Sequence, residues 1–280
     1  MKIGMNLFLW TTRVTEQHFP LIEHLANSGF DLIELPNAEY SRHEINALRG
    51  HLDQLGLART VATLCQEETN PIANNPQVRQ RALEQLQREI DLTAQLGGEA
   101  LIGPIHSAHK VFSGQGPSDT EIGYCVEFLR TAGEYAQSAG IELSVEFLNR
   151  FECYFLNTSK QAQSLVNAVA LDNVGVLYDT HHAQIEERNQ YDALSESIGC
   201  INQIHVSESH RGTPGTGTVD WSGVFSALNQ HHYNGRIVIE AFGNTVPDIV
   251  SAVNIWRNNF SCEEEVYREG LALIQSKLSY

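Results

Sequence analysis

Residues 139–147 read Ala-Gly-Ile-Glu-Leu-Ser-Val-Glu-Phe, and this stretch joins the end of a helix to an apolar strand. The amphipathic segment from Ile122 to Ala139 leads up to Gly140, and glycine is the residue type that most readily terminates a helix. The strand predicted next, Ile141 to Phe147, is short and largely apolar and carries an acid, Glu146, near its end. Helix, glycine and strand therefore follow one another within a few residues.

The same order recurs along the whole chain. Eight short runs rich in β-branched and other apolar residues are candidate strands. They are Ile3 to Leu9, Asp31 to Leu35, Ala58 to Leu64, Glu99 to Ile105, Ile141 to Phe147, Val174 to Asp179, Ile201 to Val206 and Arg236 to Ala241. Helix-like stretches with an apolar stripe separate them, and several of these stretches end in a glycine just before the next strand, where it would cap the helix. The glycine positions are Ser28-Gly29, Leu55-Gly56, Gly97-Gly98, Ala139-Gly140 and Asn234-Gly235.

Eight strand and helix units without a Pro-, Ser- or Gly-rich linker predict an α/β fold in which one (β/α)8 barrel closes on itself. A doubly wound sheet is the second choice. Since such barrels often exceed about 250 residues as one domain, we expect residues 1–280 to form a single domain. Active sites of these barrels lie where the strands end, so the residues at those ends are the first candidates for function.

Charge and cysteine usage narrow the range of partners. The 18 Lys and Arg residues against 34 Asp and Glu give a formal net charge of -16, which repels a phosphate backbone and an anionic membrane surface. We therefore expect neither nucleic acid nor a membrane as a partner.

The 5 cysteines form no CxxC pair and are odd in number, which favours reduced thiols and a cytoplasmic protein. The apolar start of the chain is better explained by a first buried strand than by a signal peptide.

Four strands in the second half of the chain end on, or close to, a side chain that can bind a divalent cation. These side chains are Glu146, Asp179, His205 and Glu240. Because the carboxyl ends of neighbouring parallel strands meet at one edge, we expect the four to converge. Three carboxylates and one imidazole form an oxygen-rich site that leaves room for a substrate. Each acid alone often caps a helix or pairs with an arginine, but their joint placement indicates a metal centre.

Three motifs lie in the same region. They are Val145 to Glu152, Asp179 to Glu187, and His205 through Arg211 to Pro214-Gly215-Thr216-Gly217. These motifs resemble the signatures of the ketose 3-epimerases, the D-tagatose/D-psicose 3-epimerase group within the xylose-isomerase-like TIM barrels. Shorter likenesses occur at Gly29-Phe30-Asp31 and at Val253-Asn254-Ile255-Trp256-Arg257, so the resemblance spans nearly the whole chain.

The resemblance implies a set of residue roles. In that family one divalent cation, commonly Mn²⁺ with Mg²⁺ and Co²⁺ as alternatives, binds at the positions that match Glu146, Asp179, His205 and Glu240. The two glutamates of this set also transfer the protons. The oxygens of a monosaccharide substrate are held at the positions that match Glu152, His182 and Arg211. Members are often dimers or tetramers, so a homo-oligomer is expected.

Inversion of C3 in a ketose fits this residue set chemically. Removal of the proton next to a ketone generates an enediolate, whose negative charge a bound cation stabilises as a Lewis acid. One carboxylate must take the proton from one face of the sugar, and a second must return a proton to the other face. Glu146 and Glu240 can flank a substrate in this way if one is protonated while the other is not. Arg211 would supply positive charge to an enediolate oxygen, unless it is a solvated loop arginine.

The sequence leaves other functions to test. An aldose-ketose isomerase would use the same metal site but move the proton between C1 and C2, and a keto-glycoside epimerase would act on a related keto-sugar. A nuclease on the same barrel would need more histidine ligands and a basic face, which this acidic chain does not offer. A sugar-binding protein without catalysis would not need the opposed pair of Glu146 and Glu240.

Several single residues also have two interpretations. Glu152 contacts the sugar or pairs with Arg150, and Glu208 supports the metal site or is a plain loop acid. His106 and His109, in the loop after the fourth predicted strand, are candidates for contacts with sugar hydroxyls.

Overall fold

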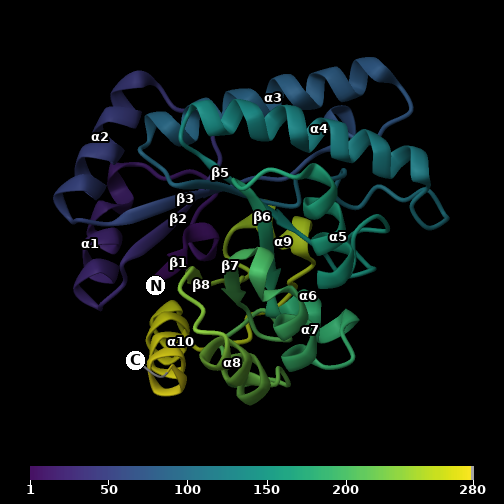
Figure 1. Ribbon diagram of the computed structural model, residues 1–280. Coiled ribbons are helices and arrows are strands. Elements are labelled where there is room, and N and C mark those ends of the chain that lie inside the picture. The colour runs from purple at the N-terminus through teal and green to yellow at the C-terminus, as the bar shows by residue number, and fades with distance from the viewer. Residues whose placement is uncertain (279–280) are drawn as a thin grey trace.

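Eight parallel strands close into one barrel in the order of the sequence, which confirms the predicted (β/α)8 fold (Figure 1). The computed structural model describes residues 1–278. The strands are β1 (Lys2–Asn6), β2 (Leu32–Pro36), β3 (Ala58–Ala62), β4 (Ala100–Gly103), β5 (Glu142–Glu146), β6 (Val174–Asp179), β7 (Ile201–Val206) and β8 (Arg236–Ile239). Pairing of β8 with β1 completes the ring.

Helices form the outer layer around the barrel (Figure 1). They are α1 (Phe19–Asn27), α2 (Arg42–Gln54), α3 (Pro76–Gln95), α4 (Asp119–Ser138), α5 (Ser159–Val169), α6 (Thr180–Glu186), α7 (Gln190–Ser197), α8 (Trp221–Gln230), α9 (Pro247–Val253) and α10 (Glu263–Lys277). Short 3-10 turns occupy Leu7–Leu9, Glu16–His18, Glu67–Thr69 and Ile198–Cys200. The long helices α3 and α4 lie side by side (Figure 1).

Local signals in the sequence set the ends of most helices. Helix α4 begins with a capping box in which Ser118 and Glu121 satisfy each other's backbone N–H groups. It ends at Ser138, and Gly140, two residues later, has a φ of 71°, in the left-handed region that glycine adopts without strain. The glycines after α1, α2 and α3 also have positive φ. The prediction for Gly235 is wrong, because α8 already ends at Gln230 and the positive φ falls on His232, at 50°.

Several strands are shorter than predicted, and the reason is visible at β1. The strand stops at Asn6 because the Asn6 side-chain oxygen accepts the backbone N–H of Phe8 at 2.7 Å and starts a 3-10 turn. The last strand in the sequence, β8, stops at Ile239. Glu240 follows it directly and still donates its backbone N–H to the carbonyl oxygen of Val206 at 3.2 Å. The edge at which the functional candidates lie is therefore held by backbone hydrogen bonds.

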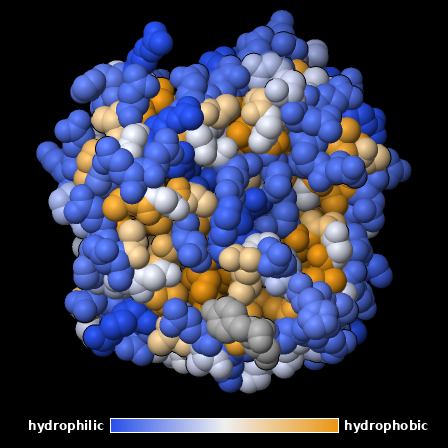
Figure 2. Space-filling model, turned by 60° about the vertical axis from the view of Figure 1, so that its left-hand side comes forward, coloured by the Kyte–Doolittle hydropathy of each residue, from blue (hydrophilic) through white to orange (hydrophobic). Residues whose placement is uncertain are grey.

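The face of the molecule shown in Figure 2 is mostly polar, in keeping with the acidic composition. On the face in Figure 2, apolar side chains gather in separate patches between hydrophilic ones. Across residues 1–278, the helices lack the combined length and hydrophobicity that a bilayer crossing requires.

Candidate active site

The four predicted metal ligands come together at the carboxyl ends of the strands. Glu146 ends β5 and Asp179 ends β6, while His205 is the last residue but one of β7 and Glu240 directly follows β8. One potential ligand atom from each residue lies within 4.8 Å of the others, and all four side chains are buried. Asp179 and His205 are paired in register across β6 and β7, which places them at the same height. This donor set is one that a divalent cation accepts.

The imidazole of His205 is oriented as a ligand would be. Its Nε2 lies 2.8 Å from Oε1 of Glu34, an acceptor, so Nε2 carries the proton. Its Nδ1 is buried, lies 3.3 Å from Oε1 of Glu240, and finds no hydrogen-bond partner within residues 1–278. Because buried polar atoms are nearly always paired, an unpaired nitrogen among carboxylates indicates a place for a cation. The residues present therefore fit the group that the fold family implies.

Burial and neighbouring charge place the two glutamates in different protonation states. Burial, together with the charge of Glu240, raises the pKa of Glu146 well above its ordinary 4.5. Burial also acts to raise the pKa of Glu240, but the charges of His205 and Arg211 outweigh it and hold that pKa below 4.5. Among the protein's own groups, the site thus pairs a carboxylic acid with a carboxylate, the two states that a proton exchange needs.

Arg211 lies inside the acidic cluster. Its Nη1 donates to Oδ2 of Asp179 at 2.6 Å and to Oε2 of Glu240 at 2.7 Å. Its Nη2 lies 3.0 Å from Nε2 of His182. The side chain is buried, so the interpretation of a solvated loop arginine is wrong. The backbone φ of Arg211 is 62°, a strained value for a non-glycine residue that is held by its N–H bond to the carbonyl of Glu208 at 2.8 Å.

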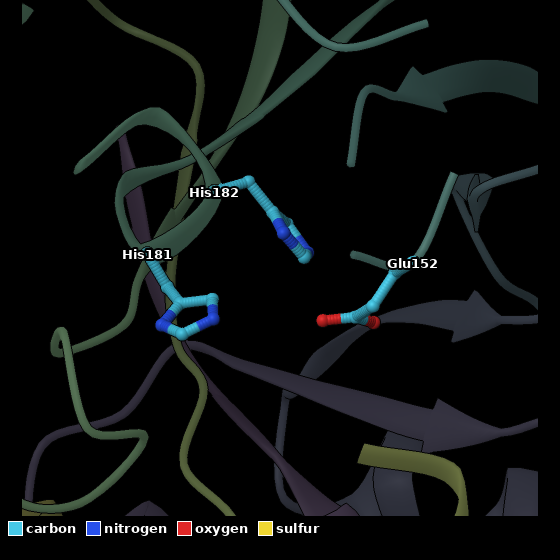
Figure 3. Close-up of side chains that lie close together, drawn as sticks. All are labelled: Glu152, His181 and His182. Carbon is cyan, nitrogen blue, oxygen red and sulfur yellow. The ribbon is translucent and has the colours of Figure 1, made fainter. Parts of the chain in front are cut away.

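Glu152 and His182 lie next to this cluster and, with His181, point toward a common space (Figure 3). Oε2 of Glu152 lies 3.1 Å from Nε2 of His109, and its Oε1 accepts from Nδ2 of Asn149 at 2.8 Å. Burial acts to raise the pKa of Glu152, but the hydrogen bonds from His109 and Asn149 and the charge of Arg211 outweigh it and lower that pKa. Glu152 is thus an ionised acceptor beside the proposed ligands.

The alternative pairing of Glu152 with Arg150 is wrong. Arg150 instead places Nη2 at 2.9 Å from Oε2 of Glu186. His182, by contrast, is buried and neutral. Its Nδ1 accepts a backbone N–H at 3.0 Å, and burial together with the positive charge of Arg211 lowers its pKa to about 3. A neutral imidazole can donate one hydrogen bond to a ligand without adding charge to the site.

Two other candidates lie outside the cavity. His106 is buried, and its Nε2 donates to the backbone carbonyl of Glu146 at 2.9 Å, so it positions the end of β5. Glu208 accepts backbone N–H groups of its own loop, from Ser209 at 2.8 Å and Gly215 at 2.9 Å, which makes it a loop acid.

The sequence analysis did not identify Glu34 as part of the site. This residue lies inside the apolar strand β2 and is fully buried against His205. A signal was present, because a charged residue inside an apolar strand is costly unless a partner balances it.

A cavity of about 400 Å³ opens at this end of the barrel, a volume typical of a small-molecule site. One wall carries the titratable groups just described. Its residues include Glu146, Glu152, His182, His205, Arg211 and Glu240. The rest of the lining comes from both halves of the chain and mixes apolar and polar side chains, with Phe242, Ile249 and Val253 from the second half. Its residues include Phe8, Asn37, Thr63, Leu64, Gln85 and Glu89.

Known proteins resemble this chain along its length. Residues 22–277 match a family model described as xylose isomerase-like TIM barrel. The sequence is 30% identical to a ketose 3-epimerase of Arthrobacter globiformis, over 100% of this chain and 97% of that protein. It is 26% identical to a 3-dehydro-D-guloside 4-epimerase of Escherichia coli, over 86% of this chain and 92% of that protein. A solved structure of L-ribulose 3-epimerase matches with a TM-score of 0.94 and 28% identity, covering 99% of this chain and 94% of that chain.

Proposed function

Because this chain belongs to the xylose isomerase-like TIM barrel family and is one of its sugar epimerase and isomerase enzymes, we propose that it inverts C3 of a free ketose such as D-tagatose, D-psicose or L-ribulose. One observation carries the proposal. Glu146 and Glu240 reach the same buried cluster from β5 and from the end of β8, which are not neighbours in the barrel. Two carboxyl groups that approach a substrate from different strands are what an inversion requires.

One divalent cation belongs to the proposal. The residues that would hold it are Glu146, Asp179, His205 and Glu240. Mn²⁺ is the first choice, with Mg²⁺ and Co²⁺ as alternatives, since carboxylate oxygens and one imidazole suit all three. When bound, the cation supplies Lewis-acid stabilisation of the negative charge that develops on the sugar oxygens.

The protein's own carboxyl groups carry the proton steps. In one direction the ionised Glu240 takes the proton from C3, and the protonated Glu146 returns a proton to the opposite face of the enediolate. In the reverse direction the two exchange roles. The opposite pKa directions of the two groups support this division, because an inversion needs a base and an acid at the same moment.

Three residues would hold the sugar's oxygens in place. Arg211 offers a fixed positive charge to the enediolate oxygens, and Glu152 accepts hydrogen bonds from hydroxyl groups. His182, neutral and buried, would contact the sugar through Nε2, because its Nδ1 already accepts a backbone N–H. The burial of His182 and Arg211 keeps water away from these contacts, which strengthens them.

A second candidate is epimerisation of a keto-glycoside at a neighbouring carbon. The resemblance to the E. coli 3-dehydro-D-guloside 4-epimerase favours it, since the same pair of carboxyl groups would serve at C4. An aldose-ketose isomerase, which exchanges protons between C1 and C2, is a third use of the same groups.

The test is to incubate the purified protein and Mn²⁺ with a panel of ketoses and keto-glycosides in D₂O. The proposal expects deuterium at C3 together with the new epimer. Deuterium at C1 or C2 would support the isomerase, and deuterium at C4 of a keto-glycoside would support the second candidate. Saturable sugar binding without any exchange would refute an enzymatic role for Glu146 and Glu240.

We further propose that residues 1–280 form one domain of a cytoplasmic homo-oligomer, either a dimer or a tetramer. Closure of all eight strands into one barrel supports the single domain. Light scattering on the purified protein measures the assembly, and a monomeric mass would contradict it.

A further inference from the structure

Glu34 is a buried acid to which the proton steps and sugar contacts above give no role. It lies in β2, on the far side of the barrel from β6, and is fully shielded from solvent. Its Oε1 lies 2.8 Å from Nε2 of His205, which is one of the four side chains that would hold the cation. A buried carboxylate of this kind needs partners on all its lone pairs.

Four donors surround the carboxylate. At Oε1 they are Nε2 of His205 and Nδ2 of Asn6, each at 2.8 Å. At Oε2 they are Oγ1 of Thr60 at 2.8 Å and Nε2 of Gln203 at 2.5 Å. With every donor aimed at it, Glu34 acts as an acceptor only and is fixed in position. The Nε2 atom of His205 must then carry a proton, and its Nδ1 atom is left without a hydrogen-bond partner among the described residues.

We infer that Glu34 is a positioning residue that holds His205 in the Nε2-protonated form and turns its Nδ1 toward Asp179, Glu146 and Glu240. The inference rests on the cation of the proposed function. An imidazole ligand binds through one nitrogen while the other donates to a carboxylate, which fixes both the tautomer and the ring orientation. Glu34 supplies that second contact.

Asn6 extends the effect to a second ligand. Its Nδ2 donates to Glu34 at 2.8 Å and also lies 3.3 Å from Oε1 of Glu240. The same network therefore fixes the imidazole and one of the proton-transferring acids relative to each other. A buried ion pair that served stability alone would not need an imidazole nitrogen left unpaired and facing three other acids.

The experiment compares Mn²⁺ binding to metal-free wild type, Glu34→Gln and Glu187→Gln by calorimetry. Glutamine keeps the size of Glu34 but replaces one accepting oxygen with an NH₂ group that opposes two of the four donors. The control, Glu187, accepts two hydrogen bonds from Ser159 at the start of α5 and does not line the cavity.

We expect Glu34→Gln to bind Mn²⁺ about 10- to 100-fold more weakly, as is typical when the outer partner of a ligand histidine is lost. Glu187→Gln should bind as wild type does. Wild-type affinity in Glu34→Gln overturns the inference and leaves the cation site standing, whereas wild type that does not bind Mn²⁺ overturns both. Equal weakening in both variants also overturns the inference.

A second measurement needs no variant. In ¹⁵N-histidine-labelled wild type saturated with Mg²⁺, the nitrogen shifts of His205 report which ring atom is protonated. A proton on Nε2 alone supports the role of Glu34, and any proton on Nδ1 overturns it, even if Glu34→Gln does not fold.

Discussion

Replacement of Glu208 by glutamine should detach the loop after β7. The carboxylate is fully buried and accepts four hydrogen bonds. Its Oε1 accepts the backbone N–H groups of Ser209 at 2.8 Å and Val219 at 3.2 Å. Its Oε2 accepts the backbone N–H of Gly215 at 2.9 Å and the indole N–H of Trp221 at 3.0 Å. One side chain thus ties both ends and the middle of the loop together.

The magnitude follows from this count. Glutamine retains one oxygen, so two of the four donors lose their acceptor and face an NH₂ group instead. A hydrogen bond to a charged group contributes about 1.5–3 kcal/mol, so Glu208→Gln should lower the free energy of unfolding by about 3–6 kcal/mol. The loop cannot relax easily, because a Cβ on Gly217 would lie 2.4 Å from Oε1 of Glu208, so the chain already passes close to the carboxylate.

Urea denaturation followed by circular dichroism measures the loss, and limited proteolysis locates it. Cleavage should appear first between residues 209 and 219, and kcat should fall because Arg211 lies on the same loop. The control is Glu67→Gln, an exposed acid in another loop, for which a change within about 0.5 kcal/mol is expected. If Glu208→Gln also stays within that range and resists the protease, the loop does not depend on the carboxylate.

Four further outcomes test the site. Glu146→Gln and Glu240→Gln should each lower kcat by about 10²–10⁴-fold, whereas sugar binding, measured by calorimetry, should change far less. Near-wild-type rates in either variant would refute the two-base assignment. Arg211→Lys should lower kcat by about 10- to 100-fold, because lysine cannot keep the guanidinium contacts with two acids, and unchanged kinetics would exclude it from catalysis. Removal of divalent ions with a chelator should abolish turnover and added Mn²⁺ should restore it, whereas full activity of metal-free protein would contradict the cation. Burial acts to raise the pKa of Glu208, but its four hydrogen bonds outweigh burial and hold that pKa below 4.5. The stability that Glu208 contributes should therefore be complete above about pH 4.5 and should decline as the pH falls toward the lowered pKa. A Tm difference between wild type and Glu208→Gln that does not shrink below pH 4.5 would contradict this.

Patterns within short segments account for what could be predicted. Apolar runs followed by polar turns located all eight strands, and the side chains at their ends identified the cluster of Glu146, Asp179, His205 and Glu240. The positions of the strands and of this cluster both follow from residues that are close in sequence, because every parallel strand of the barrel places its last residues at the same edge.

Contacts between distant segments could not be read in that way. Glu34 meets His205 only because the closed barrel brings β2 and β7, which are not neighbouring strands, within contact through its interior, and no local pattern encodes that distance. The end of β1 was misplaced for a related reason. The side chain of Asn6 competes with the strand for the backbone N–H of Phe8, and such competition depends on one hydrogen bond rather than on hydrophobicity.

The proposed proton-transferring residues of the cavity, Glu146 and Glu240, both come from the second half of the chain. The cavity lining also includes Phe242, Ile249 and Val253 from this half, whereas Asn37, Thr63 and Gln85 come from the first half. Directed evolution toward a new sugar can therefore randomise Asn37, Thr63 and Gln85 while keeping Asn6 and Glu34, which contact Glu240 and His205. Such libraries would leave the proton-moving residues intact.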